Sequence, residues 1–360
     1  MNNLQKLHER FNQSAWVDNL SRELISSGKL QTHIDNGIRG LTSNPTILEN
    51  AITKSSAYDE QIHSLIDKGL STEQIYWQIV EDDIRAAAKL LHPIWVESDG
   101  IDGYVSLEVS PELSNDGAAT LAQAKQLWKT LDIPNLMIKV PATDASVPAI
   151  HQLLANGVNV NVTLVFSLNH YKQVAAAHRA THTLGHVNNA RSIASFFISR
   201  VDSEVDARLD AIGTDKALKL RGKAAVAQAR LAYGIFLEQF ADAAVLEPES
   251  PAIQRLLWAS TSTKNPAYDD LMYVTHLLAP HTINTLPEVT IDKILDHLPS
   301  DAHSLLLTDI VDAQHVMRNL REVGIDMDDV AKTLENEGVT KFKASFTSLL
   351  AAIDAKRTAA

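Results

Sequence analysis

Short apolar segments alternate with longer segments of helical character along most of the chain. Runs of apolar and β-branched residues predict eight strands, at residues 14–20, 36–45, 103–111, 135–143, 158–166, 191–201, 256–266 and 281–287. Between them apolar residues recur at helical spacing, as at Ile75, Ile79 and Ile84 in a helical region of residues 56–91. This alternation predicts a parallel sheet, and eight strands is the number that closes a (β/α)8 TIM barrel.

The segments after the eighth strand are all of helical character. The main ones are residues 313–322 and 326–353. We therefore predict a single (β/α)8 barrel domain over residues 1–360, with helices from about residue 300 packing on the barrel or forming a subunit contact. An open doubly wound sheet is the rival architecture. It usually carries a glycine-rich phosphate turn after its first strand, and this sequence has none there.

The fourth predicted strand carries a lysine in its middle. Met137, Lys139 and Pro141 fall on one face of this strand, which we expect to point into the barrel. Burial disfavours an ammonium and can lower the pKa of a lysine from about 10.4 to roughly 7–8, where the free amine can attack a ketone and form a Schiff base. From this segment alone, a lysine that reaches solvent or pairs with a carboxylate is the alternative.

Polar residues occur in or at the ends of six of the predicted strands. They are Asp18, Asn44, Glu108, Lys139, Asn161, Thr163 and Ser195. In a closed barrel the carboxyl ends of the strands converge on the rim that carries the active site. Packing does not readily explain polar groups on six strands, because each buried polar group needs a partner. The pattern indicates an enzyme, and no spacing of two histidines and a carboxylate at this rim indicates a metal.

Composition narrows the class of protein. The chain has 360 residues, of which 45% are hydrophobic and 21% charged, as in ordinary globular proteins. Cysteine is absent, which excludes disulfides and thiolate chemistry. No signal peptide and no run of about 18 apolar residues is evident, so we expect a cytoplasmic protein that does not span a membrane. A net charge of −12 argues against a nucleic-acid surface and means that an anionic substrate needs a local cluster of cations.

Four histidines recur on one face of a predicted helix. His170, His178, His182 and His186 are spaced by eight, four and four residues. We interpret them as a solvated or partly packed helix face and not as a metal stripe, because no carboxylate accompanies them.

Four segments resemble the signature segments of the transaldolase family. They are Trp16-Val-Asp18, Leu41-Thr-Ser-Asn-Pro45, Ile138-Lys-Val-Pro-Ala-Thr143 and Asn161-Val-Thr-Leu-Val-Phe166, in the family's order within residues 14–290. The family's fold is a (β/α)8 barrel with extra helices. The resemblance implies a transferase without a cofactor that forms a homodimer, with a monomer as the alternative. It would pass a dihydroxyacetone unit from sedoheptulose 7-phosphate to glyceraldehyde 3-phosphate, giving erythrose 4-phosphate and fructose 6-phosphate.

The resemblance also implies catalytic roles for four residues. Lys139 matches the Schiff-base lysine, and Asp18 matches the general base that takes the proton of the C4 hydroxyl. A helix N-cap is the alternative role for Asp18. Glu108 and Thr163 match the pair that holds a water for proton transfer, and Glu108 can also serve as the counter-ion of Lys139.

Six further residues match substrate-binding positions of the family. Asn44 and Asn161 match residues that hydrogen-bond substrate hydroxyls, with capping at a strand end as the alternative. The phosphate is expected at Ser195, Arg200 and Lys264, with help from Ser262. Arg200 could instead pair with Asp202 or Glu204 at the surface. Many relatives carry an arginine where this chain has Lys264, so the planar two-pronged grip on phosphate is lost.

Two residues bear on the choice between transfer and release. Family members that act as fructose 6-phosphate aldolases tend to have glutamine at the position of Glu108 and tyrosine at that of Phe197. This chain has the residue of the transferases at both positions. A catalytically silent barrel that binds sugar phosphates is the alternative outside enzymes, but it would need neither Lys139 nor Asp18.

Overall fold

The chain forms a closed barrel of eight parallel strands in sequential order. The computed structural model describes residues 1–183, 189–246, 250–304 and 310–358. The strands are β1 (Gln13–Asp18), β2 (Ile38–Thr42), β3 (Val105–Glu108), β4 (Leu136–Pro141), β5 (Val160–Val165), β6 (Ser192–Phe197), β7 (Gln254–Ala259) and β8 (Thr282–Leu286). Because β8 pairs with β1 in parallel, the sheet has no free edge, and the predicted (β/α)8 barrel is confirmed.

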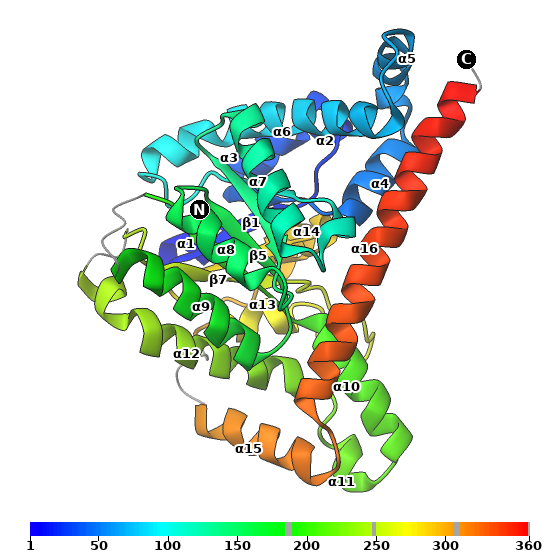
Figure 1. Cartoon of the computed structure of the whole chain (residues 1–360). Coiled ribbons are helices and arrows are strands. Elements are labelled where there is room, and N and C mark those ends of the chain that lie inside the picture. The colour runs from blue at the N-terminus through cyan, green and yellow to red at the C-terminus, as the bar shows by residue number, and fades with distance from the viewer. Residues whose placement is uncertain (184–188, 247–249, 305–309, 359–360) are drawn as a thin grey trace.

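Helices surround the barrel, as Figure 1 shows. They are α1 (Asn3–Phe11), α2 (Arg22–Ser26), α3 (Lys29–Asp35), α4 (Pro45–Lys54), α5 (Asp59–Asp67), α6 (Thr72–Glu97), α7 (Gly117–Leu131), α8 (Val147–Ala155), α9 (Leu168–Thr183), α10 (Ser199–Ile212), α11 (Asp215–Leu218), α12 (Ala224–Leu246), α13 (Met272–His276), α14 (Glu288–His297), α15 (Ile310–Glu322) and α16 (Met327–Thr358). Two short 3-10 helices lie at Ser56–Tyr58 and Pro111–Leu113. Among the described residues, no helix is both long and apolar enough to cross a lipid bilayer.

Several predicted strands are shorter in the structure: β2, predicted at 36–45, ends at Thr42, and β7, predicted at 256–266, ends at Ala259. Two further differences involve helices. The strand predicted at 191–201 ends at Phe197, and α10 begins at Ser199, so Arg200 lies in the first turn of a helix. The helical region predicted at 56–91 contains a break between α5 and α6. There Gly69 takes a left-handed φ of 77°, and the side chain of Ser71 caps α6. Both differences arise at helix starts, where an apolar run alone does not distinguish a strand from a helix.

One buried carboxylate, in the loop before β3, joins β1, β2 and β7 at the amino-terminal end of the barrel. Asp102, which is 1% exposed, accepts hydrogen bonds from Ser14 and Trp16 of β1, from Arg39 of β2 and from Arg255 of β7. Burial alone would raise the pKa of Asp102, but Arg255 and Arg39 lower it to about 2. This end of the barrel is therefore closed by a satisfied ionic network.

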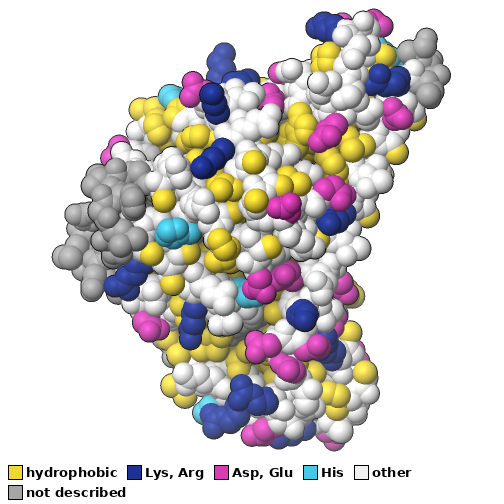
Figure 2. All heavy atoms as spheres, in the orientation of Figure 1, with side chains coloured by type: hydrophobic (Ala, Val, Ile, Leu, Met, Phe, Trp, Pro, Cys, Tyr) yellow, Lys and Arg dark blue, Asp and Glu magenta, His cyan; other side chains and the backbone are white. Residues whose placement is uncertain are grey.

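The C-terminal helices pack on the barrel in two different places. Figure 1 shows α16 running along one side of the molecule, past α10 and α4, while α15 lies beside α12. Gly338 brings α16 close to β5, since a Cβ atom there would lie 3.0 Å from Leu164 Cδ2 and 3.6 Å from Arg200 Nη1. On the face seen in Figure 2, acidic and basic side chains are interspersed.

Candidate active site

A cavity of about 140 Å3 opens at the carboxyl ends of the strands. Eight of the ten predicted site residues line it, namely Asp18, Asn44, Lys139, Thr163, Ser195, Arg200, Ser262 and Lys264. Of the remaining two, Glu108 contacts Lys139 directly, and Asn161 lies fully buried beside it on β5. The rim on which the strand ends converge therefore brings together residues that lie far apart in the sequence.

Lys139 lies in the barrel interior at the base of this cavity. Its side chain is 5% exposed, and it pairs in register with Glu108 on β3 and Asn161 on β5. Its Nζ atom lies 3.2 Å from Glu108 Oε2 and donates a hydrogen bond of 2.9 Å to the carbonyl oxygen of Ser43. The amine is thus held by two oxygen atoms, shielded from bulk solvent, and faces the cavity.

The Asp18 carboxylate stands at the end of β1 beside the cavity. Its Oδ1 atom accepts a hydrogen bond of 2.7 Å from Thr42 Oγ1. Burial raises its pKa, against the opposing effects of Lys139 and Thr42. The alternative role as a helix N-cap is not observed, because Ser21 caps α2 through its hydrogen bond from the Leu24 amide. A carboxylate with a raised pKa is a stronger base, as proton abstraction requires.

Glu108 and Thr163 flank Lys139 from the two neighbouring strands. Burial raises the pKa of Glu108, while Lys139 and then Arg200 act in the opposite direction. Thr163 Oγ1 is buried and lines the cavity, and it has no hydrogen-bond partner among the described residues. A buried hydroxyl without a protein partner is a natural position for a water molecule or a substrate hydroxyl.

Asn44 caps a helix and also lines the cavity. It is the N-cap of α4, and its Oδ1 atom accepts a hydrogen bond of 3.0 Å from the Ile47 amide. Pro45 occupies the first helical position, where proline is favoured. Because the cap uses the amide oxygen, the amide nitrogen is the group of Asn44 that can meet a ligand.

Asn161 and Ser195 are joined to each other inside the barrel. Ser195 Oγ donates a hydrogen bond of 2.7 Å to Asn161 Oδ1, and Asn161 Nδ2 donates one of 3.0 Å to Ser106 Oγ. Both ends of the Asn161 amide are therefore occupied. In this arrangement the Ser195 proton is not available to a phosphate, so the predicted contacts of these two residues with substrate stay predictions.

Arg200 supplies a cation at the cavity wall. Its guanidinium carbon lies 4.9 Å from the centroid of the Phe197 ring. Burial lowers the pKa of Arg200, while Asp18 and Glu108 act to raise it. The predicted alternatives for Arg200 are not observed: Glu204 pairs with Arg208 at 2.7 Å, and Asp202 accepts hydrogen bonds from Tyr273 and the Ala225 amide.

A second cation stands in the loop after β7. Lys264 Nζ donates a hydrogen bond of 2.7 Å to Ser262 Oγ, and both residues line the cavity. Burial lowers the pKa of Lys264, and the positive charges of Arg200 and Lys341 lower it further. An anion bound beside Lys264 would offset the repulsion from Arg200 and Lys341, so this side of the cavity is suited to phosphate.

Sequence reasoning missed the contribution of α16 to this site. Phe342, which is 3% exposed, lines the cavity from above the barrel, and Lys341 lies near enough to affect Lys264. In the sequence, Phe342 is one apolar residue in a helical stripe, and nothing there distinguishes a cavity wall from an ordinary core contact. Thr42 and Thr285 were missed as well, and they share a hydrogen bond of 2.6 Å beside Asp18.

The histidine face of α9 is partly paired with other groups. His170 Nδ1 lies 3.3 Å from Glu335 Oε2, and His178 Nε2 lies 3.1 Å from the Pro251 carbonyl oxygen. The side chains of His182 and His186 are outside the described residues. Within the described parts of the chain, no group of three or more histidine and acidic side chains is arranged to hold a metal ion.

Comparison with known proteins gives a consistent result over nearly the whole chain. The family model described as "Transaldolase/Fructose-6-phosphate aldolase" matches residues 15–353. A protein named "Transaldolase" from Mycobacterium tuberculosis (strain ATCC 25618 / H37Rv) is 46% identical over 349 residues, which cover 94% of this chain and 92% of that protein. Another of the same name from Mycobacterium marinum (strain ATCC BAA-535 / M) is 45% identical over 355 residues, covering 95% and 94% of the two chains.

Proposed function

Since this chain belongs to the transaldolase/fructose-6-phosphate aldolase family, we propose that it is a transaldolase. It would transfer a dihydroxyacetone unit from sedoheptulose 7-phosphate to glyceraldehyde 3-phosphate and release erythrose 4-phosphate and fructose 6-phosphate. The observation that carries this proposal is the position of Lys139, buried between the Glu108 carboxylate and a cavity that two cations border.

The first half of the reaction makes and uses a Schiff base on Lys139. The free amine attacks the ketone carbon of the donor to give a carbinolamine, which loses water to leave an iminium. A water held by Thr163 and Glu108 relays the protons that this dehydration requires. The free hydroxyl of Thr163 and the raised pKa of Glu108 support these roles.

Cleavage follows when Asp18 removes the proton from the C4 hydroxyl of the bound sugar. The bond between C3 and C4 breaks, its electron pair moves to the iminium nitrogen to form an enamine, and an aldehyde leaves. The acceptor aldehyde then enters, the enamine carbon attacks it, and Asp18 returns the proton to the new hydroxyl. Hydrolysis of the iminium frees the product and restores Lys139. The raised pKa of Asp18 supports both transfers.

The phosphate of the sugar serves as a handle distant from the reacting carbons. We assign it to Arg200, Lys264 and Ser262, which line one side of the cavity. Binding energy from this group can orient the keto carbon toward Lys139 and the C4 hydroxyl toward Asp18.

Trapping the covalent intermediate tests the proposal directly. Protein mixed with fructose 6-phosphate is reduced with borohydride and analysed by peptide mass spectrometry. We expect a three-carbon adduct on Lys139, with none in protein treated with borohydride alone. An unmodified mass after reduction in the presence of sugar would refute every Schiff-base function, including the aldolase alternative.

An acceptor assay separates transfer from release. We expect turnover of fructose 6-phosphate only when erythrose 4-phosphate is present, because Glu108 and Phe197 are the residues of the transferases in this family. Formation of free dihydroxyacetone without an acceptor would identify a fructose 6-phosphate aldolase instead. A chain that binds the sugar without forming an adduct would be the silent barrel.

Location and assembly are further proposals. We propose a cytoplasmic protein that binds sugar phosphates and no nucleic acid, which the net charge of −12 supports. By resemblance to the family we propose a homodimer. Light scattering on purified protein would distinguish a dimer from a monomer.

A further inference from the structure

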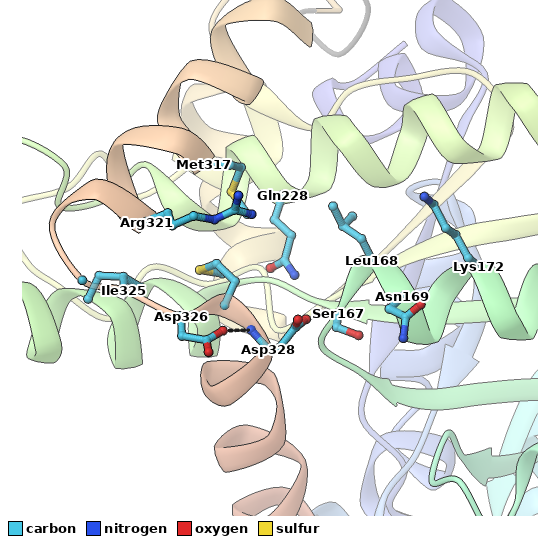
Figure 3. Close-up of a pocket in the computed structure, with 12 residues that line it drawn as sticks. Ser167, Leu168, Asn169, Lys172, Gln228, Met317, Arg321, Ile325, Asp326 and Asp328 are labelled. Carbon is cyan, nitrogen blue, oxygen red and sulfur yellow. Dashed lines mark hydrogen bonds between the residues drawn. The ribbon is translucent and has the colours of Figure 1, made fainter.

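A second and larger cavity lies outside the barrel. It has a volume of about 600 Å3 and is bordered by the start of α9, by α12 and by the turn between α15 and α16. Figure 3 shows side chains from these separate segments converging on it. Cavities of this size are within the range that small-molecule sites occupy.

A buried amide with one unused oxygen lies in its wall. Gln228 of α12 is 2% exposed, and its Nε2 atom donates a hydrogen bond of 2.8 Å to the Phe166 carbonyl oxygen. Its Oε1 atom is buried and has no hydrogen-bond partner among the described residues. A buried acceptor without a partner costs folding free energy, so a ligand in the cavity that donated a hydrogen bond to this oxygen would be stabilising.

The charged groups around the cavity are divided between cations and carboxylates. Arg321 of α15 points inward in Figure 3, and Lys172 of α9 lies at the edge. Neither residue forms an ion pair in the parts of the chain that the structure describes. Asp326 is occupied in starting α16, where its Oδ1 atom accepts the Asp328 amide at 2.9 Å. The side chain of Asp328 adds a further acceptor to the cavity wall.

We propose that this cavity is a second ligand site, separate from the barrel mouth, for a small phosphorylated polyol. The phosphate would lie at Arg321, with Lys172 at the opposite edge of the cavity in Figure 3 adding positive charge, and hydroxyl groups would donate to Gln228 Oε1 and to Asp328. The guanidinium of Arg321 can bind two phosphate oxygens at once, and the added charge of Lys172 at the edge favours a dianionic phosphate over the single carboxylate of an amino acid. The proposal does not depend on the transaldolase chemistry.

The site adjoins the active site through a short series of contacts. The Phe166 carbonyl that accepts from Gln228 belongs to a residue whose ring lies 4.9 Å from the ring of Phe197. Phe197 in turn lines the barrel cavity beneath Arg200. A ligand that contacts Gln228 is thus two residues away from the wall of the catalytic cavity.

Calorimetric titration with sorbitol 6-phosphate tests the site, because this polyol has no carbonyl and cannot react with Lys139. The titration is done in an Arg200→Glu background, which removes the phosphate cation of the barrel mouth. We expect one equivalent to bind to Arg200→Glu. Adding Arg321→Glu should weaken binding at least tenfold, whereas adding Arg318→Glu, on the same helix but not lining the cavity, should leave it unchanged.

Three results would overturn the proposal. They are the absence of binding to Arg200→Glu with native circular dichroism, equal weakening by Arg321→Glu and Arg318→Glu, and binding of inorganic phosphate as tight as that of sorbitol 6-phosphate. The last would mean that no hydroxyl group is recognised. Arg321→Glu alone should keep wild-type turnover of fructose 6-phosphate, so a failure of the proposed catalytic function is detected separately.

Discussion

At the residue scale, the proposed chemistry depends on the small set of groups that contact Lys139. Within the described residues its amine contacts one carboxylate and one carbonyl oxygen, and the adjoining hydroxyl of Thr163 has no hydrogen-bond partner there. A nucleophilic amine needs a neighbouring group that can take up and return protons, and Glu108 is placed for that at 3.2 Å. The arrangement is therefore more specific than a structural ion pair, in which no free hydroxyl and no adjoining cavity are required.

Replacing this amine should remove activity without removing the fold. In Lys139→Ala we expect the transfer rate to fall by roughly three orders of magnitude or more, as is usual when a covalent nucleophile is lost. Burial already raises the pKa of Glu108, so its carboxyl can take up a proton and remain buried as a neutral group. Steady-state kinetics measures the loss, and circular dichroism checks the fold. Lys129→Ala, at an exposed helix position, is the control and should retain wild-type rates.

Lys264 should act on phosphate and not on the reacting carbons. A hydrogen bond between charged partners contributes about 1.5–3 kcal/mol, so Lys264→Ala should lower kcat/KM for fructose 6-phosphate about 10- to 100-fold. Lys264→Arg should retain or improve it, because the guanidinium can bind two phosphate oxygens at once. Unphosphorylated fructose is the control substrate, and its kcat/KM should be the same in all three proteins. An equal loss on both sugars would show that Lys264 acts elsewhere.

The sequence alone could predict which residues lie at the strand ends, but it could not predict which hydrogen bonds they form. Lys139, Asp18 and Asn44 lie in segments with distinctive neighbours, and the barrel rule then places them at one rim. The Ser195 to Asn161 hydrogen bond depends on how β5 and β6 are aligned, and this alignment includes a register shift between Val162 and Val165. No pattern within either strand encodes that shift, so the roles of these two residues could not be distinguished from the sequence.

At the scale of elements, α16 is the part of the molecule whose position matters most for the site. It brings Phe342 into the cavity wall, and the glycine at position 338 leaves room for its close approach to Leu164. Gly338 and Phe342 are four residues apart and so lie on one helical face, with Lys341 three residues after the glycine on the same side. The sequence predicts the helix itself, but the face that covers the barrel mouth is defined by tertiary contacts.

A larger residue at Gly338 should disturb this contact. In Gly338→Val we expect overpacking against Leu164 and Arg200 to cost about 1–3 kcal/mol of stability and to lower kcat/KM for fructose 6-phosphate. Gly234→Val in α12 is the matched control, because a Cβ there meets only Ile310, at 3.8 Å. Thermal unfolding and kinetics on both variants give the comparison. An equal loss of kcat/KM in the Gly234→Val control would show that the effect comes from placing a β-branched residue in a helix and not from the contacts of residue 338.

At the scale of the whole molecule, the two ends of the barrel have opposite electrostatic character. At the amino-terminal end, Asp102 satisfies Arg39 and Arg255 within a buried network. At the carboxyl end, burial lowers the pKa of Arg200 and of Lys264, and Arg200 lowers that of Lys264 further. Asp18 and Glu108 act on Arg200 in the opposite direction, but among the described residues no carboxylate forms an ion pair with either cation as Asp102 does at the other end. The amino-terminal end of the barrel is thus closed by its own ion pairs, whereas the carboxyl end is suited to bind an anion. Local sequence could not show this, because the partners of Asp102 come from positions 14, 16, 39 and 255.

The Asp102 network makes a prediction about the stability of the whole chain. If residues 1–360 form one folding unit, as we propose, removing this charge should shift a single unfolding transition monitored by circular dichroism and tryptophan fluorescence. Asp102→Asn leaves two partly buried arginines, with side chains 18% and 12% exposed, without their carboxylate, so we expect a loss of about 3 kcal/mol. Separate transitions for the two probes would indicate that the C-terminal helices unfold independently of the barrel.

The pH dependence of the same variant gives an independent check with a definite sign. The pKa of Asp102 is lowered in the folded protein from 3.8 to about 2, so the folded state favours the ionised carboxylate. Its contribution to stability is therefore fully present above about pH 4 and is lost as the pH falls toward 2. A shift of this size corresponds to about 2–3 kcal/mol. The difference in unfolding free energy between wild type and Asp102→Asn should shrink over this interval, and a difference that stays constant would mean that Asp102 is not the group responsible.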